Sequence, residues 1–263
     1  MGAVIEMAGL VGGLAQLASI VSAFWLGGRL IRRALRGQGK PEMLLGVHLV
    51  LTMGVGSLLL TVVSVSAHSD TGVSPTGLFA LAISGNSVVI VGLMAALWFN
   101  YDVFHAGQRA GRLLAFACSA LMWAGFAYLV WAGGLIGEHQ FSTTYMPFCL
   151  AMVLTDLWVA VDALRFRAQM AKRLALGLAE PIVVERLALW GYGAVARIGL
   201  VVMTPVVNWL APTAEQRAVV SPWLLVLSGF LILTTCVAYW LMLSPTEGYR
   251  RWVERRYAAQ TVS

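Results

Sequence analysis

Two oppositely charged residues lie inside long apolar runs of this 263-residue chain. Asp156 comes nine residues after Pro147, and Arg197 comes ten residues after Leu187. At 1.5 Å per helical residue, each side chain lies roughly 13 to 15 Å from the end of its run. A charge at the centre of a bilayer costs several kcal/mol unless it is paired, hydrated or neutralised, so we expect an Asp156–Arg197 ion pair. Such a pair can fix helix register, or it can form a site for a proton, an ion or a polar ligand.

Three further residues belong to the same hypothesis. Trp190 lies on the face of its helix that also carries Arg197. Asn86 is flanked by serine and glycine, a pattern typical of closely packed helices that could also supply a neutral ligand contact to the same centre. Pro205 lies inside an apolar run, where proline frees the carbonyl of Val201 and can act as a hinge.

Other ionisable residues receive simpler interpretations. Asp162 precedes Arg165 by three residues, so we expect a local surface pair rather than a proton relay. His48 is expected near the inner membrane surface as a hydrogen-bonded interfacial histidine. His68 and Asp70 together could bind a metal or sense pH, but no third ligand accompanies them.

No cofactor is expected. Haem needs an axial partner at a matching depth, and the histidines besides His48 fall in expected loops, at His68, His105 and His139. Retinal needs a lysine in the last helix, whereas Lys40 and Lys172 lie in expected loops. Each cysteine falls inside an apolar run without metal-ligand spacing, which predicts small buried side chains and no metal site.

The composition predicts the elements that position these residues. Hydrophobic residues make up 59% of the chain and charged residues 11%, whereas soluble domains contain about 25% charged residues. Lipid must therefore be the solvent for much of the surface, and a helix needs about 20 apolar residues to cross it. We predict an all-α membrane protein with one transmembrane domain at 1–247 and seven helices, over about 8–29, 43–67, 77–100, 113–135, 147–164, 187–210 and 223–243.

The basic residues predict an orientation. They cluster in four segments, 29–40, 109–112, 165–186 and 250–256, and these segments alternate with loops that carry almost no lysine or arginine. The positive-inside rule then places the N-terminus outside and the C-terminus in the cytoplasm. Clusters distributed in this way mark one side of a membrane, which excludes a nucleic-acid-binding surface. We expect an integral protein of a bacterial inner membrane.

Aromatic and basic residues also predict contacts with the membrane surface. Trp25, Trp98, Trp158 and Trp240 fall near the cytoplasmic ends of four helices, as in an interfacial aromatic belt or in related helix hairpins. The tail 248–263 is expected to be a short amphipathic helix on the anionic lipids of the inner leaflet. Its membrane-surface residues would be Arg250, Arg251, Trp252, Arg255 and Arg256.

The function expected from these features is that of a small receptor or sensor. A polar centre around Asn86, Asp156 and Arg197 would bind a small ligand or respond to protons and relay to a cytoplasmic protein partner. One alternative is a small transporter or ion channel that uses the same charges, and another is an accessory or scaffold subunit of a membrane complex. An enzyme is disfavoured, because no acid, base and nucleophile converge by spacing.

Overall fold

The described residues of this computed structural model, 2–68, 72–135, 143–211 and 213–261, form helices and short connections only. Seven helices are long and apolar enough to cross a membrane, which identifies an integral membrane protein. The second span consists of three consecutive segments, α2 (Lys40–His48), η2 (Leu49–Gly56) and α3 (Ser57–His68). The other six spans are α1 (Gly2–Arg33), α4 (Pro75–Phe104), α5 (Arg109–Trp131), α6 (Met146–Ala175), α7 (Pro181–Leu210) and α8 (Ala214–Leu243). Short segments η1 (Ala34–Gln38) and η4 (Thr143–Tyr145) and a last helix, α9 (Glu247–Thr261), complete the chain.

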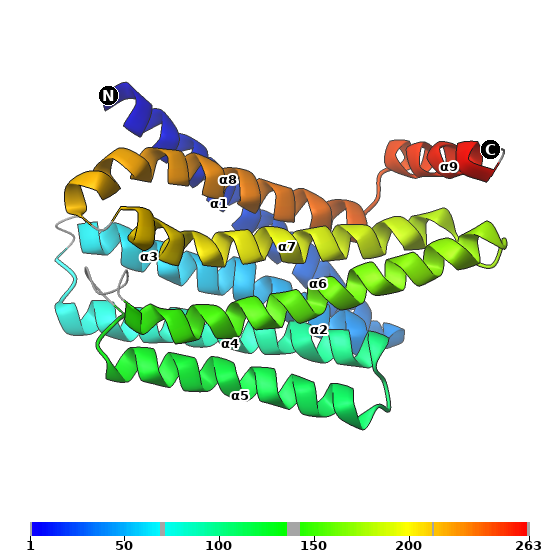
Figure 1. The fold of residues 1–263 in the computed structure, drawn as a ribbon, viewed down its shortest axis with the longest axis horizontal. Helices are drawn as coiled ribbons and strands as arrows, with labels where there is room; N and C mark the ends of the chain where they lie inside the picture. The colour runs from blue at the N-terminus through cyan, green and yellow to red at the C-terminus, as the bar shows by residue number, and fades with distance from the viewer. Residues whose placement is uncertain (1, 69–71, 136–142, 212, 262–263) are drawn as a thin grey trace.

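The long helices lie side by side (Figure 1). Along the chain, α1 packs on α2 and η2, which pack on α4; α6 packs on α4 and α7, and α7 packs on α8. Helix α8 returns to α1 and closes a ring, with α5 on the outside against α4 and α6. The connections α1–α2, α4–α5 and α6–α7, together with α9, lie toward one end of the molecule (Figure 1), which we call the basic end because the four basic clusters lie there.

Glycines allow the closest helix crossings. A Cβ added at Gly27 of α1 would lie 2.8 Å from Gly46 O, and one added at Gly46 of α2 would lie 2.9 Å from Gly27 O. Both distances are too short for a carbon–oxygen contact, so only glycine permits the two backbones to meet here. Such small-residue contacts are typical of packed membrane helices.

The second span contains a wide turn. Between α2 and α3, η2 forms a π-helix, in which each backbone hydrogen bond spans one residue more than in an α-helix. The segment contains Gly54 and Gly56, which offer little steric resistance to irregular backbone geometry. The wide turn begins directly after His48, a residue of the candidate site described below.

Helices α8 and α5 have boundaries that differ from those predicted. Helix α8 begins at Ala214 rather than at about residue 223, because Thr213 and Gln216 form a reciprocal capping box at its start. Pro222 therefore lies inside α8, and Figure 1 shows this helix bending near its N-terminal end, as proline inside a helix requires. Helix α5 covers Arg109–Trp131 rather than 113–135, because Gly133 turns the chain with a φ of 70°.

The α6–α7 hairpin extends beyond the other spans at the basic end (Figure 1). Helix α6 continues to Ala175, beyond the predicted end at about residue 164. Helix α7 begins at Pro181, six residues before the predicted start at 187, with proline in the first turn where its missing N–H costs nothing. The extended hairpin gives α9 a surface to pack against.

Candidate functional site

The expected contact between Asp156 and Arg197 is present at the interface of α6 and α7. Arg197 donates from Nε and Nη2 to Asp156 Oδ1, over 3.0 Å and 2.6 Å. Both residues are buried, with exposed fractions of 3% for Asp156 and 7% for Arg197. The guanidinium thus neutralises the carboxylate inside the ring of helices, which offsets part of the cost of burying either charge.

The same guanidinium holds a second partner, Tyr239 of α8. Arg197 Nη1 donates to Tyr239 Oη, and Tyr239 Oη also lies 3.2 Å from Nε2 of His48 on α2. The other ring nitrogen of His48, Nδ1, lies 3.0 Å from the carbonyl oxygen of Gly92 on α4. A continuous set of polar contacts, which we call the central network, therefore joins α6, α7, α8, α2 and α4.

The direction of each hydrogen bond in the central network follows from one group. Gly92 O can only accept, so His48 Nδ1 must carry its hydrogen and donate it. In the neutral ring Nε2 is then an acceptor, so Tyr239 donates to His48 while accepting from Arg197. Neutral His48 is thus compatible with the hydrogen bonds that join Arg197, Tyr239 and the Gly92 carbonyl.

Aromatic rings enclose the network. Trp190 of α7 lies edge-on to Tyr239 and His48, with ring centroids 5.6 Å and 6.4 Å away, and Phe99 of α4 lies 5.2 Å from Trp190. The Arg197 guanidinium carbon lies 5.9 Å from the Trp190 ring and 5.7 Å from the Tyr239 ring, within the range of cation–π attraction. Trp190 Nε1 is buried without a hydrogen-bond partner in the described part of the chain, so it is an unused donor beside the network.

Gly92 allows α4 to contribute its carbonyl to the central network. A Cβ added at Gly92 would lie 2.2 Å from Thr52 Oγ1 and 2.9 Å from Thr52 N. Only glycine therefore allows α4 to approach η2 so closely that its carbonyl reaches His48. Thr52 Oγ1 itself lies 3.2 Å from His48 Nδ1 and adds a second polar contact to that nitrogen.

A second polar cluster lies nearer the basic end, between α4 and α6. Asp162 Oδ2 accepts from Asn100 Nδ2 over 2.7 Å and lies 2.7 Å from His105 Nε2. The expected local pair between Asp162 and Arg165 is wrong, because a tertiary partner from α4 occupies the carboxylate instead. Asn100 Oδ1 is buried and has no hydrogen-bond partner among the described residues.

The sequence placed His48 wrongly, whereas His105 lies in the connection between α4 and α5, as predicted. His48 is fully buried at the centre, not interfacial, because α2 begins at Lys40 and places it about 12 Å along the span. His105, predicted to be a loop residue, follows the last residue of α4 and turns its ring toward α6. In the sequence, the one sign of the contact between His105 and Asp162 was that Asp162, a carboxylate inside an apolar run, needs a polar partner.

Two other predicted site residues lie away from the central network. Asn86 donates to Ala82 O within its own helix, over 2.9 Å, and is joined to neither Asp156 nor Arg197. Pro205 lies inside α7, and the carbonyl of Val201 that it frees accepts a long hydrogen bond from Cys149 Sγ, over 3.9 Å. This contact satisfies the freed carbonyl, while the role of Pro205 as a hinge stays a prediction.

The tail forms a helix whose position differs from the expected one. Arg256 pairs with Glu185 of α7 over 3.2 Å, and Tyr257 donates to the same carboxylate over 2.9 Å. Helix α9 therefore runs alongside the α6–α7 hairpin (Figure 1) rather than flat across the helix ends. The remaining residues of the predicted membrane-surface set are exposed, namely Arg250, Arg251, Trp252 and Arg255.

Neither a metal site nor a relative supplies a function. Across the described residues, no group of three or more His, Cys, Asp or Glu side chains could hold a metal ion. Asp70 and the side chain of His68 lie outside the described part of the chain, so their expected metal or pH site stays a prediction. No protein-family model, curated protein or solved structure matches this chain.

Proposed function

We propose that this chain is a multipass membrane receptor or sensor whose central network responds to protons or to a small polar ligand. The observation that carries the proposal is the unbroken line of hydrogen bonds from Asp156 through Arg197 and Tyr239 to His48. These residues come from four helices, so a change at one of them alters how the helices are held together. Buried ionisable groups inside membrane spans are most often functional.

Protonation of His48 would rearrange the network. A charged imidazole donates from both nitrogens, so Nε2 could no longer accept from Tyr239. Tyr239 Oη would then face two donors, His48 and Arg197, and two positive charges would lie around one buried phenol. The facing groups are Thr52 and the Gly92 carbonyl beside His48, with Asp156 as the one carboxylate that the network contains.

Protonation of His48 and opening of the helix ring are therefore linked. Charged His48 is costly in the closed, dry arrangement and is favoured where α2 and α8 separate and admit water. The unused Trp190 Nε1 donor, at the same centre, gives a polar ligand or an entering water a group to bind. By the positive-inside rule the basic end faces the cytoplasm, so α9 and the α6–α7 hairpin would present the change to a protein partner.

Distance measurements between spin labels test this proposal. Labels at Lys40→Cys and Glu247→Cys, both exposed positions, would be compared at pH 8 and pH 5 in lipid nanodiscs, with the three buried cysteines replaced by alanine. We expect an acid-dependent change in distance that His48→Gln abolishes, because glutamine keeps a neutral donor and acceptor but cannot take up the proton. The matched control His105→Gln should retain the change.

The rival functions give different results. No acid response in the unsubstituted protein, or an unchanged response in His48→Gln, would overturn a proton-sensing role for this residue. Proton or ion flux into liposomes that Asp156→Asn abolishes would indicate the transporter or channel. A co-purifying membrane complex, together with tolerance of neutral substitutions at Asp156 and Arg197, would indicate the accessory or scaffold subunit.

A further inference from the structure

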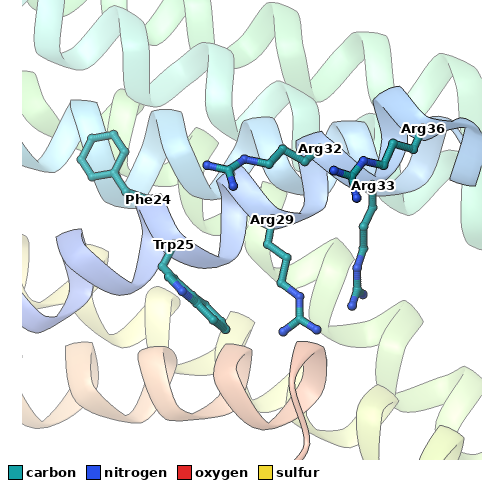
Figure 2. Close-up of a pocket in the computed structure, with 7 residues that line it drawn as sticks. Phe24, Trp25, Arg29, Arg32, Arg33 and Arg36 are labelled. Atoms are coloured by element: carbon teal, nitrogen blue, oxygen red, sulfur yellow. The ribbon is translucent and has the colours of Figure 1, made fainter.

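A cavity of about 390 Å³ lies along the basic end of α1. Its lining consists of Phe24, Trp25, Gly28, Arg29, Arg32, Arg33 and Arg36. Figure 2 shows Arg29 extending toward the end of α8 alongside Trp25, while Arg32 and Arg36 extend back along α1 in the direction of Phe24. Four guanidinium groups thus surround one hollow that has aromatic rings at its inner end.

No carboxylate in the described part of the chain balances the positive charge of this cavity. Among the described residues, none of the four arginines forms a salt bridge with a carboxylate. Arg29 Nη1 donates to Ser244 Oγ over 2.7 Å, a neutral partner that orients the group without neutralising it. Four like charges on about two helical turns repel one another, so an anion is the partner that this cluster lacks.

Trp25, at the aromatic end of the cavity, contacts a ring of α8 and one of the arginines. Trp25 stacks on Trp240 of α8 with ring centroids 4.7 Å apart, and the Arg29 guanidinium carbon lies 5.5 Å from the Trp25 ring. Tryptophan prefers the headgroup level of a bilayer, so this stack marks that level on α1 and α8. Arg29 and Arg32 follow Trp25 by four and seven residues, or roughly 6 to 10 Å, which places them among lipid phosphates.

An apolar stripe leads into the cavity from the other side. Leu14, Leu17 and Val21 lie on the face of α1 that also carries Trp25, and their exposed fractions are 65%, 58% and 60%. The distance along the helix from Leu14 to Trp25 is roughly 16 Å, about half of a 30 Å hydrocarbon core. The same face of α1 is thus apolar over the length of one leaflet and basic beyond it.

We propose that this face of α1 binds an anionic phospholipid, with its phosphate among Arg29, Arg32, Arg33 and Arg36. The acyl chains would lie along Leu14, Leu17 and Val21. Arginine suits this role because its planar fork donates two hydrogen bonds to phosphate oxygens. The proposed lipid site and the central network have no residue in common, so the lipid site does not depend on the proposed function.

Native mass spectrometry of the detergent-solubilised protein tests the site. Phosphatidylglycerol would be titrated against phosphatidylcholine, with the variant Arg32→Gln/Arg36→Gln, whose side chains are exposed. Each arginine near a lipid surface contributes about fivefold in affinity, so we expect the double variant to bind phosphatidylglycerol about thirtyfold more weakly. The matched control Arg109→Gln/Arg112→Gln removes the same charge at the same end of the molecule and should bind as the unsubstituted protein does.

Two outcomes would overturn the proposal. Equal weakening in both double variants would show a diffuse attraction to positive charge rather than a site on α1. Displacement of the bound lipid by millimolar inorganic phosphate would show that the cavity takes free phosphate and that the apolar stripe contributes nothing. Retention of phosphatidylglycerol over phosphatidylcholine in the presence of phosphate supports the lipid as the source.

Discussion

Replacing the charges of Asp156 and Arg197 one at a time should destabilise the protein far more than replacing both. Asp156→Asn leaves the Arg197 guanidinium, 7% exposed, without a counter-charge. Arginine cannot lose its proton in a protein, so this variant has no way to neutralise itself. Breaking a buried ion pair in this way costs about 3–5 kcal/mol.

The reverse single change should be milder. In Arg197→Gln the remaining carboxylate of Asp156 can take up a proton and become neutral. The free energy of unfolding should therefore fall less in this variant than in Asp156→Asn. The double variant removes both charges, and asparagine and glutamine can keep a hydrogen bond. Its free energy of unfolding should therefore be only about 1–2 kcal/mol below that of the unsubstituted protein. Relative to Asp156→Asn, the second substitution therefore restores about 2 kcal/mol, which is roughly thirtyfold in the unfolding equilibrium.

Unfolding in mixed micelles of dodecyl sulfate and a mild detergent, followed by circular dichroism, measures these free energies. The partly exposed pair Lys40–Asp102, with side-chain exposed fractions of 68% and 18%, provides the matched control. Its double-mutant cycle should give a coupling below about 1 kcal/mol. A double variant of Asp156 and Arg197 that is no more stable than the worse single variant would refute direct pairing.

Three further substitutions and a pH titration test other parts of the structure. Gly92→Ala should lower the free energy of unfolding by about 1–3 kcal/mol, because the new Cβ meets Thr52; Gly13→Ala, with open space around it, should instead raise it by about 0.5–1 kcal/mol. Glu185→Gln should release α9 and speed tryptic cleavage there. Burial, and then the hydrogen bond to Glu185, raise the pKa of Tyr257. The docking contribution of this phenol should therefore be complete below about pH 10 and be lost as the pH rises through the raised pKa, which the same proteolysis measures at increasing pH.

The apolar runs predicted the number of spans because hydropathy alone determines which segments can enter lipid. Counting residues from each end also paired Asp156 with Arg197, since antiparallel neighbours of similar length bring equal depths together. The carbonyl freed by Pro205 was correctly expected at Val201, because proline acts at a fixed spacing along its own helix. These predictions depend on local geometry or on neighbours along the chain.

Contacts between distant helices were missed for a physical reason. Tyr239 lies in an apolar run where a phenol resembles a core or interfacial aromatic residue, and only the rotation of α8 brings it to Arg197. Asp162 had a suitable local partner in Arg165, but its carboxylate instead contacts Asn100 of α4 and His105, which directly follows α4. Asn86 lies in a small polar patch that could also have supplied a contact to the centre, yet such a patch does not determine which way the residue faces.

The contact of α1 with α8 has a consequence for how the protein is made. Spans enter the membrane in the order of synthesis, so the ring cannot close until the last span has been inserted. Asp156 and Arg197 belong to consecutive spans and can neutralise each other as a hairpin while the rest of the chain is still on the ribosome. Tyr239 is inserted one span later, with α8. His48 belongs to the second span, so its contact with Tyr239 can form only at that stage. The charged pair is thus supplied early, when an unpaired charge would hinder insertion, and the neutral contacts that join the first half of the chain to the last are completed at the end.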